Sequence, residues 1–369
     1  MADTKPREYD LVLYGATGYT GGLTAQYITK HLPSDLHWAI AGRSPSKLNA
    51  LSSTLTPLRP DRPPPSTETI EHTKDALVAL ARKTRVLITT VGPFHLHGSL
   101  VMEVCATAGT HYVDSTGETP WVYEVAHKCH ELAKSNGACL ITQCAMDSAP
   151  ADLAAYALVR FLRENCVAET KEVVHSIQEW RNGMSGGTLH SLIGVAGSYP
   201  FTHLKESIKP LALCLDGVHP KNRPRAFGWS GTKRQDDVGL LTDSVIGIPD
   251  AGLVYRSWSL MDYGEGFSYF TGMKAANRVS GFFWHAGLIA SLPMLLVSPI
   301  RKLLTSVLPS PGEGPSENEA AIVLLRPDRE NWAQRLGGGV LTPATLGDQY
   351  VERVKTAGLK MDIGFVGQC

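Results

Sequence analysis

Three glycines near the start of the chain have a spacing that suits the binding of a dinucleotide. Gly15, Gly18 and Gly21 follow the apolar run 11–14 in a GxxGxxG pattern, and an amphipathic stretch comes next. In such a loop the first glycine permits a tight turn, the second lets backbone N–H groups approach a pyrophosphate, and the third allows close helix packing. The sequence therefore predicts a strand, a phosphate-binding turn and a helix. The turn supplies three further candidate cofactor contacts: Thr17, Tyr19 and Thr20.

The residues after the second apolar run distinguish the two common nicotinamide dinucleotides. The run 37–41 leads into Gly42, Arg43 and Ser44, where a site for NAD usually places an acidic residue. The Arg43 guanidinium can pair with the 2′-phosphate that only NADP carries, and Ser44 can donate a hydrogen bond to it. Alternatively, Ser44 caps a helix that has Pro45 at its first position while Arg43 is solvated, and both interpretations can hold together. We therefore expect NADPH as the cofactor.

The elements that must position these residues alternate between strand and helix patterns over residues 1–155, the expected dinucleotide-binding domain. Such alternation predicts an α/β fold with a Rossmann-type doubly wound parallel sheet, in which ligands bind outside the carboxyl ends of the strands. Six strands are expected near residues 11–14, 37–41, 69–70, 85–91, 111–114 and 138–143. The fourth strand leads to candidate residues for the nicotinamide pocket: Val91, Gly92, Pro93 and Phe94. For Pro93 and Phe94, a turn and a core aromatic are equally good interpretations.

Acidic residues at the ends of the fifth and sixth strands are candidates for proton transfer, which hydride transfer from a nicotinamide often requires. Asp114 and Glu118 follow the fifth strand, and Asp147 and Asp152 follow the sixth. We take Asp147 as the candidate catalytic residue. Capping of the helix that begins near residue 151 is the alternative for Asp147 and Asp152.

Residues 156–308 have a different character and are predicted to form an α+β substrate domain. Runs such as Glu172–Trp180 and Val254–Leu260 are rich in Thr, Val and aromatic residues, which favours a mostly antiparallel sheet. A glycine-flanked pair of hydroxyls suits either contact with a substrate carbonyl or a hairpin turn. This candidate substrate site comprises Ser185, Gly186, Gly187 and Thr188.

The segment Phe282–Leu308 is apolar, but prolines and basic residues leave its uninterrupted part too short to span a membrane. We expect a helix pair that is buried within the chain or forms a homodimer, with attachment to a lipid surface as the alternative. Residues 309–337 begin with a polar linker, and residues 338–369 form a C-terminal segment that contains a helical pattern.

The composition excludes several classes of protein. The chain of 369 residues is 43% hydrophobic, and its 35 Lys and Arg residues balance 35 Asp and Glu residues, so charge gives no argument for nucleic acid. The 7 cysteines contain no CxxC pair and the 13 histidines no HExxH motif, so no metal site is expected. Residues 1–10 lack the apolar core of a secretory signal, and we therefore expect a cytoplasmic protein, with a lipid surface as a second location.

Seven collinear motifs resemble those of the saccharopine dehydrogenase-like oxidoreductases, a group that includes the trans-acting enoyl reductases. They are GATGYTG at Gly15, AGR at Ala41, TTVGPF at Thr89, AGTHYVDSTGE at Ala108, MDSAPADL at Met146, SGGT at Ser185 and GGVLTP at Gly338. The resemblance implies a Rossmann domain, an inserted substrate domain and a C-terminal segment that returns to the Rossmann domain. It also implies reduction by NADPH of an unsaturated acyl or imine-like carbon in a hydrophobic molecule of secondary or lipid metabolism, presented by a carrier protein.

The chain departs from the family pattern in two places. Ala145 and Met146 precede Asp147 where relatives have Gly-Phe, and only Asn318–Gly337 fills a gap in which relatives have a longer stretch. The second departure predicts that part of the substrate domain is missing and that turnover is weak although NADPH binds. The alternative function is a non-redox binding, isomerising or cyclising protein with a vestigial or structural nucleotide site.

Overall fold

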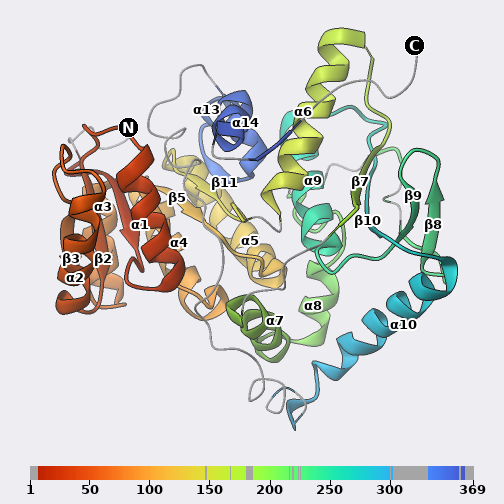
Figure 1. Cartoon of the computed structure of the whole chain (residues 1–369), viewed down its shortest axis with the longest axis horizontal. Helices are drawn as coiled ribbons and strands as arrows, with labels where there is room; N and C mark the ends of the chain where they lie inside the picture. Colours follow the sequence, from red (N-terminus) through yellow and green to blue (C-terminus); the bar gives the residue numbers. More distant parts are fainter. Residues whose placement is uncertain are drawn as a thin grey trace. The chain divides into compact units, whose positions relative to one another are not determined.

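The computed structural model describes residues 7–145, 148–166, 168–179, 186–215, 217, 220–222, 224, 226–299, 301, 331–356 and 359–361. The chain divides into two compact units, which are considered separately (Figure 1). The first unit draws its described residues from Met1–Gly117, Glu124–Met146 and Ser310–Leu359. The second draws them from Glu118–Tyr123, Asp147–Pro309 and Lys360–Cys369.

The first unit is built on a seven-stranded sheet in which every paired strand is parallel, in the order β11-β6-β5-β4-β1-β2-β3. This arrangement confirms the predicted Rossmann-type fold. The strands are β1 (Tyr9–Tyr14), β2 (Trp38–Gly42), β3 (Ser66–Thr69), β4 (Thr84–Thr89), β5 (His111–Asp114), β6 (Cys139–Ile141) and β11 (Gly339–Leu341). The first six lie at the predicted positions, and the seventh comes from the C-terminal segment.

Helices follow the strands in turn and bury them. They are α1 (Tyr19–His31), α2 (Pro45–Leu55), α3 (Lys74–Lys83), α4 (Phe94–Ala108) and α5 (Thr119–Ser135), which belongs to this unit from Glu124 onward, with α13 (Trp332–Leu336) and α14 (Gly347–Thr356) near β11 in sequence. Leu11, Leu13 and Ile40 in the central strands are fully buried, as expected for a parallel sheet covered on both faces.

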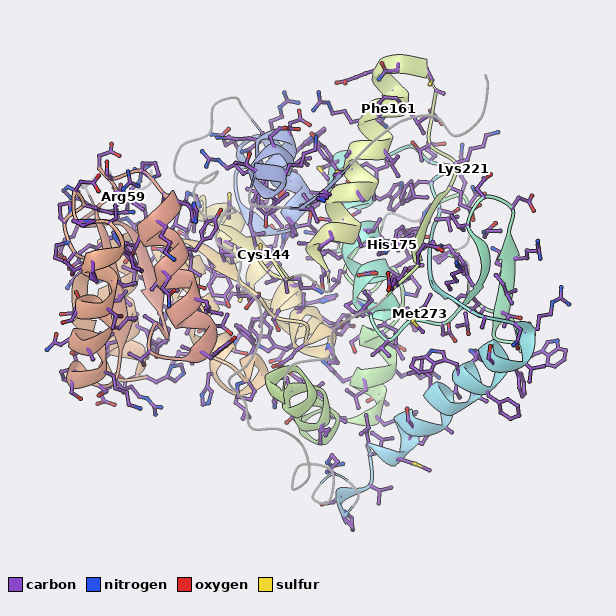
Figure 2. All side chains as sticks on the ribbon, viewed as in Figure 1. Arg59, Cys144, Phe161, His175, Lys221 and Met273 are labelled. Carbon is purple, nitrogen blue, oxygen red and sulfur yellow. The ribbon has the colours of Figure 1, made fainter. Side chains whose placement is uncertain are left out.

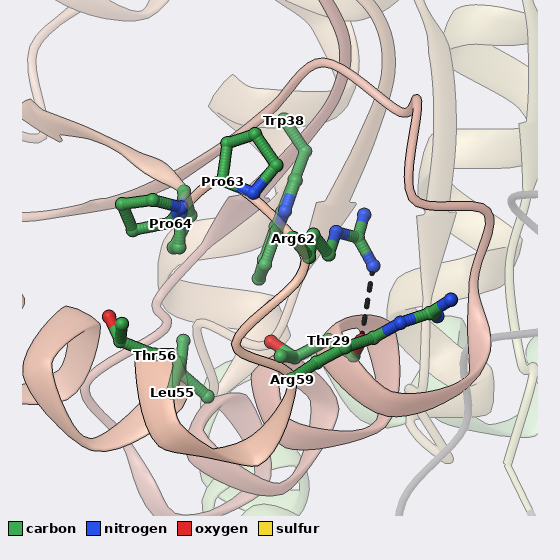
Figure 3. Close-up of a pocket in the computed structure, with 9 residues that line it drawn as sticks. Thr29, Trp38, Leu55, Thr56, Arg59, Arg62, Pro63 and Pro64 are labelled. Atoms are coloured by element: carbon green, nitrogen blue, oxygen red, sulfur yellow. Dashed lines mark hydrogen bonds between the residues drawn. The ribbon is translucent and has the colours of Figure 1, made fainter.

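The proline-rich loop between α2 and β3 packs against the amino end of β2. Arg62 in this loop donates to the carbonyl oxygens of Ile28 at 2.6 Å and Thr29 at 3.3 Å, which satisfies the last turn of α1. Figure 3 shows the bond to Thr29. Its guanidinium also lies 5.5 Å from the centre of the Trp38 ring. The shallow hollow at this point is lined by Arg62, Trp38 and neighbouring prolines, and it lies at the amino end of β2, whereas ligands of this fold bind at the carboxyl ends.

The second unit contains a four-stranded mixed sheet in the order β7-β10-β9-β8. β10 (Tyr269–Lys274) pairs in parallel with β7 (Val173–Ile177) and antiparallel with β9 (Gly239–Thr242), which pairs antiparallel with β8 (Thr232–Gln235). The helices of this unit are α6 (Ala149–Cys166), α7 (Gly186–Ser198), α8 (Phe201–Ser207), α9 (Gly247–Met261) and α10 (Arg278–Met294).

The run Val254–Leu260, expected to be a strand, lies inside helix α9, so this prediction was wrong. Val254, Trp258 and Met261 are buried at helical spacing, and the neighbours between them are mostly buried too because α9 packs against both α6 and β10. A helix covered on most sides has little exposed surface to give its sequence a clear amphipathic period, so it is hard to distinguish from a buried strand.

The segment Phe282–Leu308 forms the larger part of α10, a turn at 295–297 and helical residues at 298–299 and 301. Residues 300 and 302–308 lie outside the described residues. The expected burial within the chain is not found among the described residues, since Phe283 is 68% exposed and Ile289 is 52% exposed. No helix in the described part of the chain is long and apolar enough to cross a membrane. Most of the predicted linker, residues 309–330, also lies outside the described residues.

Candidate functional site

The glycine-rich turn after β1 is held in a closed conformation by its neighbours. Gly15 has a φ angle of +87°, which glycine adopts without the strain that a side chain would cause. Its N–H donates to the carbonyl oxygen of Ala41 at 3.0 Å, and its own carbonyl accepts the N–H of Gly18 at 3.0 Å. A Cβ atom at Gly21 would lie 2.2 Å from the Gly15 oxygen. The third glycine therefore allows α1 to pack directly on the turn.

The start of α1 offers backbone N–H groups to a ligand. Gly18 occupies the N-cap position with no capping side chain, and the first turn contains no acidic residue. Thr17, Gly18 and Tyr19 are exposed, whereas Thr20 is half-buried. An uncapped helix start with exposed backbone and a positive dipole end suits an anionic group. The turn and helix therefore fit the pyrophosphate of a dinucleotide.

The residues after β4 lie beside the glycine turn. The Thr90 hydroxyl donates to the Gly15 oxygen at 3.2 Å, and the side chain of Val91 lies 2.7 Å from where a Gly15 Cβ would be. Gly92 is exposed and Pro93 is half-buried. Phe94 is buried at the first position of α4, so its ring contributes to the core. The structure thus brings the expected nicotinamide-pocket segment next to the phosphate-binding turn.

The two residues expected to recognise the 2′-phosphate follow β2. Ser44 caps α2 by accepting the N–H of Lys47 at 3.4 Å, and Pro45 stands at the first helical position. Arg43 is exposed at the carboxyl end of β2. One titratable residue near Arg43 was missed by sequence reasoning, because no motif marks it: His72, which follows β3.

The acidic candidates that the structure describes have structural partners. The buried carboxylate of Asp114 accepts hydrogen bonds from the Tyr112 hydroxyl at 2.7 Å and from the N–H groups of Thr116 and Gln143 at 3.0 Å each. Asp152 is buried in the first turn of α6, and its carboxylate accepts a hydrogen bond from the Ser257 hydroxyl. Both carboxylates are therefore engaged in holding the fold together.

Of three further candidate residues, the structure describes Glu118 but not Asp147 or Ser185. Glu118 is buried. Gly186 begins α7, which includes Gly187 and Thr188. The alternative of a hairpin turn at these glycines was therefore wrong, since they start a helix.

A cluster of titratable side chains that was not predicted from sequence lies within the second unit. His175 on β7, labelled in Figure 2, stands opposite Thr271 on β10. Its Nδ1 atom lies 3.3 Å from Asp250 Oδ2 and 3.2 Å from the Tyr269 hydroxyl. Asp250 belongs to α9 and is fully buried, whereas 29% of the His175 side chain is exposed. The cluster joins three elements of this unit. No group of three or more His, Cys, Asp or Glu side chains among the described residues has a geometry that could hold a metal ion.

Comparisons with known proteins show which sequences this chain is similar to. Residues 11–141 match the family model described as the saccharopine dehydrogenase NADP binding domain. A Mycobacterium tuberculosis protein to which a trans-acting enoyl reductase activity is provisionally ascribed is 32% identical over 394 aligned residues, which cover 99% of this chain and 88% of the relative. The trans-acting enoyl reductase of Mycobacterium ulcerans is 32% identical over 332 residues, 84% of this chain and 78% of the relative. Among solved structures, saccharopine dehydrogenase (L-Glu forming) from Saccharomyces cerevisiae aligns with 50% of this chain and 40% of its own, at 15% identity and a TM-score of 0.35.

Proposed function

This chain belongs to the saccharopine dehydrogenase-like oxidoreductases that include the trans-acting enoyl reductases, and from this membership we propose that it reduces an unsaturated acyl group. It is an NADP-dependent oxidoreductase with NADPH as its cofactor. The proposed substrate is a hydrophobic enoyl thioester, presented in trans by a carrier protein, and an imine-like carbon is the related alternative. The single structural observation behind the proposal is the uncapped, glycine-lined start of α1, with Arg43 exposed after β2, the strand that pairs with β1.

In the proposed mechanism the chain mainly binds and orients. The glycine turn holds the pyrophosphate, Arg43 pairs with the 2′-phosphate, and the segment 91–94 borders the nicotinamide. When bound, NADPH would supply a hydride for the β-carbon of the enoyl group, whose α-carbon would take up a proton. We propose Asp147 for the proton transfer and residues 185–188 for contact with the substrate carbonyl.

The experiment combines cofactor occupancy with product analysis. Purified protein is saturated with NADPH, occupancy is followed by nucleotide fluorescence, and a panel of enoyl thioesters is added. Saturated product that carries deuterium from 4-deuterated NADPH supports the reductase. Bound NADPH that is not oxidised by any thioester or imine would favour the alternative, a non-redox binding or isomerising protein, which the shortened stretch 318–337 supports.

The shortened stretch gives an expected rate. We expect saturated product to form at less than about 1 per second, because part of the family's substrate region is missing while the cofactor turn is complete. Stopped-flow absorbance of NADPH measures this rate. Turnover at an ordinary enzymatic rate of roughly 1 to 1000 per second would show that the shortening does not impair catalysis.

Replacing Arg43 is expected to weaken the preference for NADPH. Arg43→Ala removes a charge-assisted contact to the 2′-phosphate, so the ratio of NADH to NADPH dissociation constants should fall about tenfold, or about 1.4 kcal/mol. Calorimetric titration with both cofactors measures the ratio. Arg82→Ala, which removes an exposed arginine from α3, serves as the control. Equal affinity of the wild type for the two cofactors would overturn the assignment.

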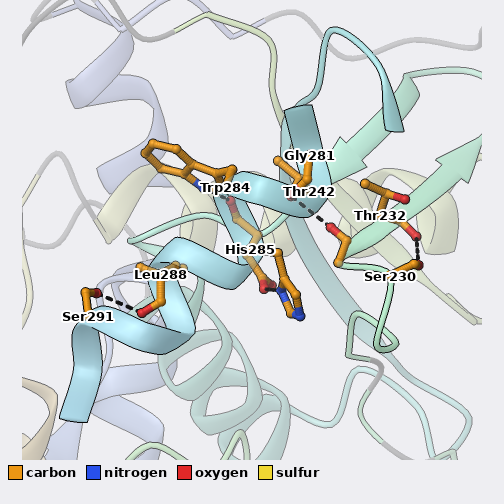
Figure 4. A network of polar contacts seen from close by, with 10 residues as sticks. Ser230, Thr232, Thr242, Gly281, Trp284, His285, Leu288 and Ser291 are labelled. Carbon is orange, nitrogen blue, oxygen red and sulfur yellow. Dashed lines mark hydrogen bonds and ion pairs between the residues drawn. The ribbon is translucent and has the colours of Figure 1, made fainter. Parts of the chain in front are cut away.

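The exposed apolar side of α10 is proposed to contact a second copy of this chain. The helix is anchored on one side, where His285 pairs with Asp243 and the Trp284 indole donates to the Asp243 carbonyl oxygen at 2.9 Å (Figure 4). Phe283 and Ile289 remain exposed. Exposed apolar patches commonly mark interaction sites.

We expect the wild type to sediment as a dimer and the Phe283→Glu/Ile289→Glu variant as a monomer, in analytical ultracentrifugation at matched concentrations. Flotation of the wild type, but not of the variant, with liposomes would instead place this surface on a lipid membrane.

A further inference from the structure

Side chains from three other places in the first unit gather around His72, which follows β3. The Tyr14 hydroxyl, at the end of β1, lies 2.9 Å from His72 Nδ1, and the two rings are stacked with an interplanar angle of 4°. His97, in the first turn of α4, meets His72 edge-on with the ring centroids 5.4 Å apart. The charge of Arg43 acts on both Tyr14 and His72. The cluster therefore lies within electrostatic range of the arginine assigned to the 2′-phosphate.

The register of the sheet explains this gathering. β2 and β3 are parallel with Gly42 opposite Thr69, and the Ile70 N–H donates to the Gly42 oxygen at 3.0 Å. Tyr14 stands opposite Ala41 on the other side of β2. The segments that follow these strands all leave the sheet at the carboxyl ends of the strands, where nucleotides bind in this fold.

We propose that His72 is a second, protonatable contact for the 2′-phosphate of NADPH, which makes the preference for NADPH over NADH increase as the pH falls. The inference rests on the proposed placement of the 2′-phosphate beside Arg43. Because Nδ1 faces the Tyr14 hydroxyl, Nε2 is the nitrogen through which the ring can donate to an outside ligand. A half-buried imidazole that is held on two sides is well placed for this role.

The electrostatic surroundings give the direction of the pH effect. Burial lowers the pKa of His72, and the neighbouring His97 and Arg43 lower it further, so the free protein holds the ring neutral near pH 7. Glu71, the carboxylate next to His72 in the chain, also acts on Tyr14. A bound phosphate dianion favours the charged imidazole and raises its pKa in the complex. Binding of NADPH therefore takes up a proton, and affinity increases as the pH falls through the pKa of the complex toward that of the free protein.

The experiment measures the dissociation constants of NADPH and NADH by nucleotide fluorescence from about pH 8.5 to about pH 6.5, where the 2′-phosphate remains largely a dianion. The variants are His72→Gln, which keeps a hydrogen-bonding side chain without the titration, and His37→Gln as a matched control. His37 is an exposed histidine that precedes β2, so it lies at the amino ends of the strands, whereas His72 lies at the carboxyl ends. Calorimetry in buffers of different ionisation enthalpy gives the number of protons taken up.

In the wild type and the control, NADPH is expected to bind about three- to tenfold more tightly at the lower pH, with proton uptake, while NADH affinity stays nearly constant. His72→Gln should lose most of this pH dependence. Equal pH dependence in the wild type and His72→Gln would overturn the inference. An equal loss of affinity for NADPH and NADH in the variant would also overturn it, because it would indicate a structural role. A pH-independent preference for NADPH overturns this inference alone, whereas absence of NADPH binding overturns the proposed function as well.

Discussion

Gly18→Val is expected to abolish binding of NADPH while the protein still folds. The substitution places a branched side chain at the exposed N-cap of α1, where the pyrophosphate must approach the backbone. Gly18 has a φ angle of −77°, and its Cβ would come no closer than 3.4 Å to the Gly15 oxygen. The cost to stability is therefore small, about 1 kcal/mol for a poor cap. The dissociation constant should rise by about a hundredfold or more, at least about 2.7 kcal/mol.

The matched control for this variant is Gly22→Ala, four residues further along the same helix. A Cβ atom at Gly22 would meet nothing within 4 Å, and alanine is a better helix former than glycine. This control should bind NADPH like the wild type and unfold at a slightly higher temperature. Fluorescence titration and thermal unfolding together separate loss of binding from loss of folding. Normal binding of NADPH by Gly18→Val would show that the turn does not hold the pyrophosphate.

Asp114→Ala is expected to lower the free energy of unfolding by about 3–5 kcal/mol, because two backbone N–H groups and the Tyr112 hydroxyl lose their buried acceptor. Asp114→Asn keeps one side-chain oxygen for the two N–H groups, so it should recover most of the loss. Asp61→Ala, at a carboxylate that is 69% exposed in a surface ion pair, should change stability by less than about 1 kcal/mol. Denaturant unfolding measures all three variants.

The same series distinguishes a structural from a catalytic role for Asp114. A carboxyl that only holds the fold is replaced by asparagine with little effect on the turnover of folded protein. A proton donor cannot be replaced in this way, because the asparagine amide does not transfer a proton at neutral pH. If Asp114→Asn were as stable as the wild type but devoid of turnover, Asp114 would become the candidate proton donor in place of Asp147.

The first unit was predictable from sequence because its signals are local. The apolar runs of a parallel sheet, the glycines of the first turn and the Ser-Pro start of α2 each depend on a few neighbouring residues. The second unit was less predictable. Its run Val254–Leu260 has little solvent-exposed surface, because α9 packs against α6 and β10. The glycines after Ser185 begin a helix rather than a turn.

The candidate site was predictable only where a motif marks it. Arg43 follows the glycines at the spacing that the fold requires. His72 becomes its neighbour through the pairing of Gly42 with Thr69, and sheet register cannot be obtained from spacing along one chain. His175 and Asp250 likewise meet across the contact of a helix with a sheet.

The place of β11 has a consequence for how the chain folds during synthesis. β11 pairs with β6 at one end of the order of strands, and the Val340 N–H donates to His130 Nδ1 at 3.1 Å. About 200 residues separate Ile141 from Leu341 in the chain, which corresponds to roughly 10–40 seconds at a ribosome that adds about 5–20 residues per second. During that interval the cofactor-binding strands can assemble while β6 remains an open edge, which is a template for pairing with other nascent chains. A product that stops before Gly339 keeps this edge permanently, so premature termination is predicted to yield aggregation rather than a smaller working protein.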